Sequence, residues 1–142
     1  MAKTICKILG VVFLLVGLIG FAKPDLMGTH LSLLHNLVHI ASGAIALYLG
    51  FAGTLSAARM FCIIFGLVYL LLGVLGFVLG APGTPSMASM ASMGSDPNLW
   101  KVIPGQFEPG RNDHILHILL GIIFLVAGFM TRADVGRVND RD

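Results

Sequence analysis

Charged residues are scarce in this sequence. They make up 11% of its 142 residues, whereas hydrophobic residues make up 56%. A soluble globular domain carries about 25% charged residues, so water cannot be the main solvent of this folded chain. The formal net charge of +2 is too small and too dispersed for a surface that binds nucleic acid.

Cysteines and catalytic motifs are also few. The chain has only two cysteines, which do not make a disulfide framework. It has no nucleophile elbow, no phosphate-binding loop and no pair of carboxylates within its apolar segments. These absences argue against an ordinary enzyme, and we expect a non-catalytic protein.

Four apolar segments account for most of the chain. Each approaches the roughly 20 residues that an α-helix needs to cross a bilayer. They predict an all-α, integral membrane four-helix bundle that forms a single transmembrane domain. The expected spans are residues 4–22, 33–53, 60–80 and 113–130. The remaining segments are expected to form a polar turn, an external loop rich in Pro, Gly, Ser and Met, and a cytoplasmic tail: 54–59, 81–112 and 131–142.

An internal repeat relates these four segments. A shift of 56 residues places the first segment on the third and matches Cys6 with Cys62. A shift of 78 residues places the second on the fourth and matches His39 with His117. Because each unit contains two spans, both units enter the membrane in the same direction. The repeat therefore predicts two tandem parallel helical hairpins related by a pseudo-two-fold axis along the membrane normal.

The distribution of lysine and arginine predicts the orientation. One side of the expected membrane protein holds Lys3, Lys7, Arg59, Arg132, Arg137 and Arg141. The other side holds Lys23, Lys101 and Arg111. Cytoplasmic segments carry the excess of positive residues, so we expect both termini in the cytoplasm and the 81–112 loop outside. The predicted location is the inner (cytoplasmic) membrane, crossed several times.

Two short motifs supply almost all the polar groups at the starts of the second and fourth spans. The first contains His35, Asn36 and His39, and the second contains Asp113, His114 and His117. Residues three or four apart lie on one helix face, and a polar side chain that faces lipid is costly. We therefore expect both motifs to face the interior of the bundle.

A structural role and a haem site are two interpretations of these motifs. In the first, Asn36, His39, Asp113, His114 and His117 form a polar cluster that hydrogen-bonds across the two helices. In the second, His39 and His117 are the axial ligands of a b-type haem, because they are symmetry-related and lie on separate helices.

A copper site is the third interpretation. Histidines four residues apart form a bidentate pair, and thioethers are soft ligands that suit Cu(I). The methionine run in the external loop resembles the methionine motifs of membrane proteins that handle copper. The candidate ligands are His35, His39, His114, His117, Met87, Met90 and Met93.

The segment His35-Asn36-Leu37-Val38-His39 also carries a resemblance to a known family. It is similar to the HNLVH motif in the second helix of a family of small bacterial four-span membrane proteins of unknown function. That family has a DN-x-x-H element before its fourth helix, where this chain has His114 in place of the usual Asn. The resemblance extends over about residues 5–130, and the long methionine-containing loop is not typical of it. It implies the four-span fold and a bacterial membrane, and it implies no activity.

The sequence as a whole predicts a small accessory or interaction subunit embedded in the lipid bilayer. Such a subunit belongs to a larger membrane complex or a homo-oligomer. A copper-binding or haem-binding membrane protein is the alternative.

Overall fold

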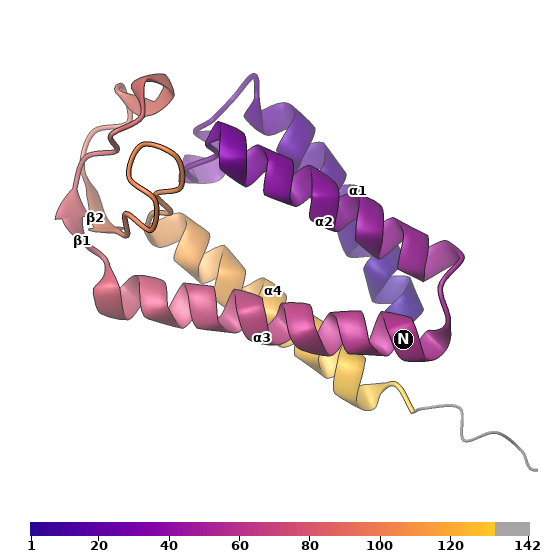
Figure 1. Ribbon diagram of the computed structural model, residues 1–142. Coiled ribbons are helices and arrows are strands. Elements are labelled where there is room, and N and C mark those ends of the chain that lie inside the picture. The colour runs from indigo at the N-terminus through magenta and orange to yellow at the C-terminus, as the bar shows by residue number, and fades with distance from the viewer. Residues whose placement is uncertain (133–142) are drawn as a thin grey trace, which may run out of the picture.

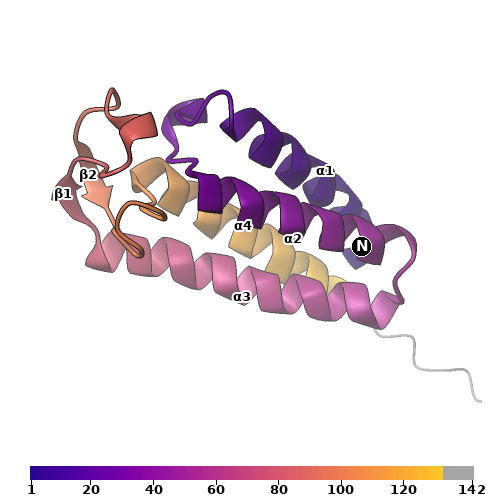
Figure 2. The ribbon, with the colours of Figure 1, turned by 45° about the horizontal axis from the view of Figure 1, so that its top comes forward.

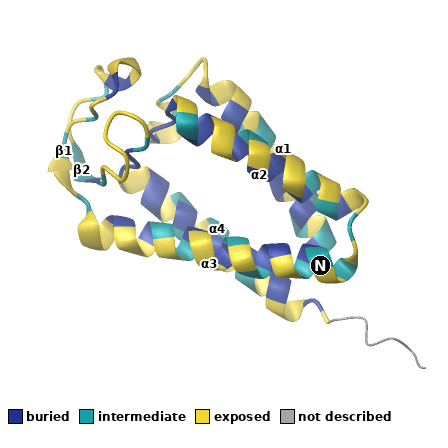
Figure 3. Ribbon diagram, viewed as in Figure 1, coloured by how far each residue is buried: buried dark blue, intermediate teal, exposed yellow. Residues whose placement is uncertain are grey.

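Four long helices form most of the molecule. The structure, a computed structural model, describes residues 1–132, so the predicted tail with Arg137 and Arg141 lies almost wholly outside the described residues. The helices are α1 (Ala2–Gly20), α2 (Leu33–Phe51), α3 (Leu55–Leu79) and α4 (Arg111–Met130). All four are long and apolar enough to cross a membrane. Much of the outward surface of these helices is exposed (Figure 3). Exposed apolar side chains include Leu18 and Val78.

The helices associate in two pairs. α1 packs along α2, and α3 packs along α4 (Figure 1). The N-terminus, the turn between α2 and α3, and Thr131 lie at one end of the bundle, which we call the short-turn end. The segments 21–32 and 80–110 lie at the opposite end, which we call the long-loop end (Figure 2).

Short polar side chains determine where two of the helices begin. The Ser32 hydroxyl accepts a hydrogen bond from His35 N and caps α2, and the Thr54 hydroxyl accepts one from Ala57 N and caps α3. Such caps satisfy backbone N–H groups that have no partner inside the helix. The prediction of a polar turn over 54–59 was therefore wrong, because the Thr54 cap starts α3 five residues earlier than expected.

The long-loop end contains a small sheet that the all-α prediction did not include. Strand β1 (Ala81–Gly83) pairs with β2 (Asp96–Leu99) in antiparallel fashion. Single 3₁₀ turns occur at Leu26–Gly28 and Ala88–Met90. Proline and glycine interrupt a helix in this region, and pairing across a short ladder satisfies the backbone groups instead.

Aromatic rings and cysteines from both helix pairs meet at the centre of the bundle. The rings of Phe13 in α1 and Tyr69 in α3 stack with centroids 5.6 Å apart. Phe124 of α4 is fully buried against both. Nearer the short-turn end, the sulfur atoms of Cys6 and Cys62 lie 3.7 Å apart. The core therefore joins the two helix pairs into one unit.

Glycines allow close approach within each helix pair. A β-carbon on Gly43 would lie 2.8 Å from the carbonyl oxygen of Gly10, and one on Gly121 would lie 2.9 Å from that of Gly66. The obstructing atoms belong to the backbone, so they cannot rotate away. Small residues that let helix backbones touch are typical of packing inside membranes.

Replacing Gly43 or Gly121 by valine should therefore destabilise the bundle. Each substitution forces two backbones apart, and overpacking of this kind costs about 1–3 kcal/mol. The expected result is a lower unfolding midpoint in detergent, measured by circular dichroism. Ala44→Val is the matched control, because Ala44 is an exposed neighbour on α2 and its midpoint should be nearly unchanged. Equal midpoints for all three variants would contradict the packing role of the glycines.

Candidate functional site

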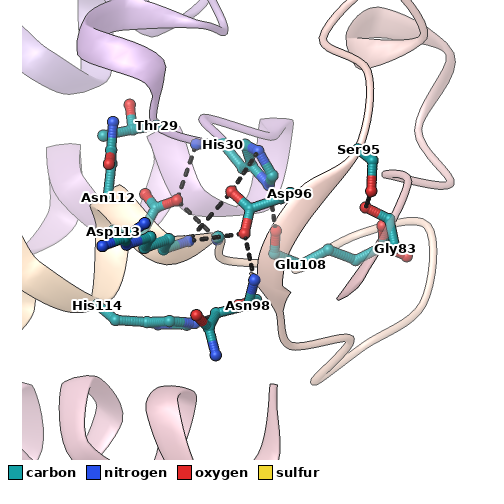
Figure 4. A network of polar contacts seen from close by, with 12 residues as sticks. Thr29, His30, Gly83, Ser95, Asp96, Asn98, Glu108, Asn112, Asp113 and His114 are labelled. Carbon is teal, nitrogen blue, oxygen red and sulfur yellow. Dashed lines mark hydrogen bonds and ion pairs between the residues drawn. The ribbon is translucent and has the colours of Figure 1, made fainter. Parts of the chain in front are cut away.

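A buried carboxylate organises the long-loop end. Asp113 lies in the first turn of α4 and is 3% exposed. Its Oδ2 accepts hydrogen bonds from the backbone N–H groups of Gly110 and His30, both at 2.9 Å (Figure 4). A negative charge is also favoured at a helix N-terminus. Asp113 thus caps α4 and attaches the 21–32 loop to it.

The ring of His30 extends this network to the longer loop. Its Nδ1 donates to the carbonyl oxygen of Glu108 at 2.9 Å, and its Nε2 lies 3.7 Å from Oδ2 of Asp96. His30 is 2% exposed. No periodic pattern in the sequence points to this residue, because it lies in a short connection between two spans.

Two further acids bind backbone N–H groups in the same region. Asp96 accepts hydrogen bonds from the N–H groups of Asn98 and Arg111. Glu108 is fully buried, and its two carboxylate oxygens accept from the N–H groups of Ser86 and Gly105, each at 2.7 Å. Sequence reasoning missed both acids. Their rarity could have identified them, because Asp96 and Glu108 are the only acidic residues in the 81–112 loop.

The environment of Glu108 favours its charged form. Burial by itself raises the pKa of the carboxyl group, but the hydrogen bonds from Ser86 and Gly105 and the charge of Lys101 outweigh it. The pKa of Glu108 therefore lies below its ordinary value of 4.5. The carboxylate is the point where two distant parts of the loop are joined.

The structure gives other partners to residues predicted to hydrogen-bond across α2 and α4. The amide nitrogen of Asn36 donates to the carbonyl oxygen of Leu31, and its carboxamide packs on Gly20 of α1. The Nε2 of His114 donates to the carbonyl oxygen of Asn98 at 2.8 Å, and its ring packs on Gly76 of α3. Asn36 therefore points from α2 to α1, and His114 points from α4 to α3. Each side chain lies on the face that its helix turns towards the paired helix, and not on the face towards the other helix pair.

Three of the predicted histidines do come together. The ring centroid of His35 lies 4.6 Å from that of His39 and 5.8 Å from that of His117. His35 Nδ1 donates to the carbonyl oxygen of His30 at 3.0 Å. The Nδ1 atoms of His39 and His117 are buried and have no hydrogen-bond partner within residues 1–132. We call these three residues the imidazole cluster.

The imidazole cluster borders a cavity of about 180 Å³ between α1, α2 and α4. Asp113 and Thr29 are the other polar residues in its wall. The rest of the lining is apolar and comes from α1, α4 and the 26–31 segment: Val12, Phe13, Val16, Leu26, Met27, Leu31, Leu116 and Leu120.

The other predicted metal ligands lie outside this cavity. Neither His114 nor any residue of the methionine run lines it. Met87 borders a separate groove with Leu33 and Leu37 of α2, and Met90 is fully buried in the loop. Within residues 1–132, no three His, Cys, Asp or Glu side chains are arranged to hold a metal ion.

These features define a class of protein: a multi-pass helical membrane protein with a buried polar network at one end. The chain belongs to the family described as Domain of unknown function (DUF4383), whose match covers residues 3–101. The matched range contains α1 to α3 and the first histidine motif, and it ends before α4. No curated protein and no solved structure matches the chain.

Acidification should release the longer loop. Because the pKa of Glu108 is lowered in the folded protein, the stability that it contributes is fully present above the ordinary pKa of 4.5 and is lost as the pH falls further. We expect faster hydrogen exchange at Ser86 and Gly105 below that pH, measured by mass spectrometry. Glu108→Gln should show the faster exchange already at neutral pH.

Asp25→Asn is the control, because Asp25 is exposed and pairs only with Lys23 at the surface. Its exchange profile in the loop should match that of the unmodified protein. Exchange at Ser86 that is equally slow in Glu108→Gln would show that this carboxylate does not hold the loop.

Proposed function

We propose that this protein is a non-catalytic integral membrane protein that acts as a small accessory or interaction subunit. In this proposal the network around Asp113 has a structural task. It holds the connecting segments on the end of the bundle, so that a defined surface is presented to partner proteins or to a second copy of the chain.

The engagement of the buried carboxylates carries this proposal. Asp113, Asp96 and Glu108 each accept hydrogen bonds from two backbone N–H groups. That these carboxylates hold backbone N–H groups in place supports a structural task for them. Removing one of them would leave buried N–H groups without acceptors, which is costly.

The finer architecture that we propose is two tandem parallel hairpins, α1–α2 and α3–α4. Equivalent contacts in the two pairs support it. The ring of Phe13 lies 5.3 Å from that of His39, and the ring of Tyr69 lies 5.2 Å from that of His117. These are the pairs related by the shifts of 56 and 78 residues.

The departure from the family motif also supports the repeat. Asn36 packs on Gly20, and its counterpart His114 packs on Gly76, the counterpart of Gly20. A different side chain therefore occupies the same position in the second hairpin. His114 gains the hydrogen bond to Asn98 in β2, so we propose that the histidine serves to anchor the longer loop of this chain.

The orientation that we propose places both termini in the cytoplasm of a bacterial cell. Lys3, Lys7, Arg59 and Arg132 belong to the short-turn end, whereas Lys23, Lys101 and Arg111 belong to the long-loop end. The excess of positive charge supports a cytoplasmic short-turn end. The polar network then faces the outside of the inner membrane.

Reporter fusions test this orientation. A reporter that is active only outside the cytoplasm should be inactive when fused after residue 142. It should be active when inserted at Gly94, an exposed loop residue with φ of +73°. A reporter that is active only in the cytoplasm, inserted at the same two places, is the control and should give the reverse pattern. The opposite results would place the long-loop end in the cytoplasm.

The geometry gives less support to a haem or copper centre. The cavity beside His39 and His117 has about 180 Å³, close to the ~150 Å³ that accommodates benzene and too small for a porphyrin. The rings of His35 and His39 stack with an interplanar angle of 22°, so they lie face to face and do not converge on a common point. The accessory role therefore remains the better supported proposal.

Substitutions of His39 and His117 by glutamine and by leucine distinguish the accessory role from a haem or copper site. We expect the purified protein to have no Soret band and no stoichiometric copper. His39→Gln and His117→Gln should each change the free energy of unfolding by no more than about 1 kcal/mol. An amide keeps a donor and an acceptor, and the Nδ1 atoms of these histidines have no hydrogen-bond partner to lose among the described residues. The measurements are visible absorbance, metal analysis and thermal unfolding.

The leucine variants at the same positions complete the test. A bound chromophore or metal that is lost equally in the glutamine and leucine variants would refute the accessory role, because an amide cannot replace an imidazole as an axial ligand.

A further inference from the structure

The hydrogen-bond network around Asp113 does not account for the cavity beside the imidazole cluster. His39 and His117 are 6% and 4% exposed, and both line the cavity. Their Nδ1 atoms have no partner among the described residues. A buried polar group without a hydrogen bond is costly. The rings of both histidines also line the cavity from separate helices, so a molecule bound there would contact them.

The cavity is accessible from the side of the bundle. Its walls come from Val12 and Val16 of α1 on one side and from Leu116 and Leu120 of α4 on the other. Val12 is 41% exposed, and Met27 at the end of the cavity is 73% exposed. Both helices are long and apolar enough to cross a membrane. The cavity thus opens between two apolar helices and beside the 21–32 segment, and its apolar walls favour a lipid-soluble ligand.

The size of the cavity limits the part of the ligand that enters it. A dry cavity of about 150 Å³ accommodates benzene, and this one has about 180 Å³. It therefore accepts a single substituted six-membered ring. The ring of Phe13 is part of the wall, and aromatic faces favour planar partners.

The polar atoms define the substituents of that ring. His35 Nδ1 donates to the carbonyl oxygen of His30 and lies 4.0 Å from Oδ1 of Asp113, so Nε2 is the ring nitrogen left for a ligand. His39 and His117 are not committed to one tautomer and can donate or accept. Asp113 brings a negative charge into the wall, which disfavours an anion such as a fatty-acid carboxylate. The cluster therefore matches neutral oxygen substituents, either carbonyl or hydroxyl.

We propose that this cavity binds the head group of an isoprenoid quinone or quinol. The ring lies beside His35, His39 and His117, with a carbonyl oxygen that accepts from an imidazole N–H or a hydroxyl that donates to an unprotonated ring nitrogen. The tail leaves between α1 and α4 into the lipid. The proposal concerns binding alone and requires no electron transfer by the protein.

Binding of decylubiquinone to the full chain in lipid nanodiscs tests this proposal. We expect saturable binding of one quinone per chain and a shift of the quinone carbonyl stretch to lower frequency in infrared difference spectra, because an imidazole N–H donates to that oxygen. The double variant His39→Leu, His117→Leu should abolish the frequency shift. Nanodiscs without protein give the background partition into lipid.

A filled cavity provides the second arm of the test. Leu120→Trp places a large side chain in the cavity and should weaken binding by about ten-fold or more, a loss of about 1.4 kcal/mol. Leu119→Trp is the matched control, because Leu119 is the exposed neighbour on α4, and its affinity should equal that of the unmodified protein. If Leu120→Trp does not fold, Val16→Phe with Leu15→Phe as its control replaces the pair.

Three outcomes would overturn the proposal. The first is binding no greater than that of empty nanodiscs. The second is equal affinity in the Leu120→Trp and Leu119→Trp variants, which would place the quinone elsewhere. The third is equal competition by decane, which would show a general apolar void and not a site for the ring. None of these outcomes bears on the accessory role, which is tested by absorbance, metal content and topology.

Discussion

The capture of backbone N–H groups by the Asp113 carboxylate is the interaction on which the long-loop end depends. One oxygen of this side chain receives the N–H of Gly110, which precedes α4, and the N–H of His30, which precedes α2. The ring of His30 in turn donates a hydrogen bond to the carbonyl oxygen of Glu108 and lies beside the carboxylate of Asp96. Where little water reaches the backbone, each N–H group needs an internal acceptor. A single carboxylate therefore caps α4 and joins the 21–32 segment to it.

Close contacts at glycines determine how the helices of each pair pack along the length of the bundle. Because α1 touches α2 at Gly10 and Gly43, and α3 touches α4 at Gly66 and Gly121, each pair is narrow and the aromatic core between the pairs is continuous. Phe13, Tyr69 and Phe124 fill the centre. Above them, towards the long-loop end, polar imidazoles replace aromatic rings and the packing leaves a cavity. The cavity is lined mainly by apolar side chains, and the imidazole cluster supplies most of its polar groups.

The acidic residues within the described range 1–132 divide into three that bind backbone N–H groups and one at the surface. Asp113, Asp96 and Glu108 are engaged by backbone groups, whereas Asp25 pairs with Lys23 in exposed surroundings, where an ion pair contributes little. The imidazole cluster belongs to neither group, because its rings line a cavity and two of them have unpartnered nitrogens. This contrast is why we assign structure to the carboxylates and ligand binding to the imidazoles.

The four apolar helices and the inward position of His35, His39 and His117 could be predicted from the sequence. Hydrophobic length and helical periodicity are local properties, and they are sufficient for these predictions. The fold was needed to show that Asn36 and His114 face the paired helices and that Met87, Met90 and Met93 lie outside the cavity. The roles of His30, Asp96 and Glu108, and the two-stranded sheet, also depended on it. These features arise from contacts between segments far apart in the chain, which no local pattern records.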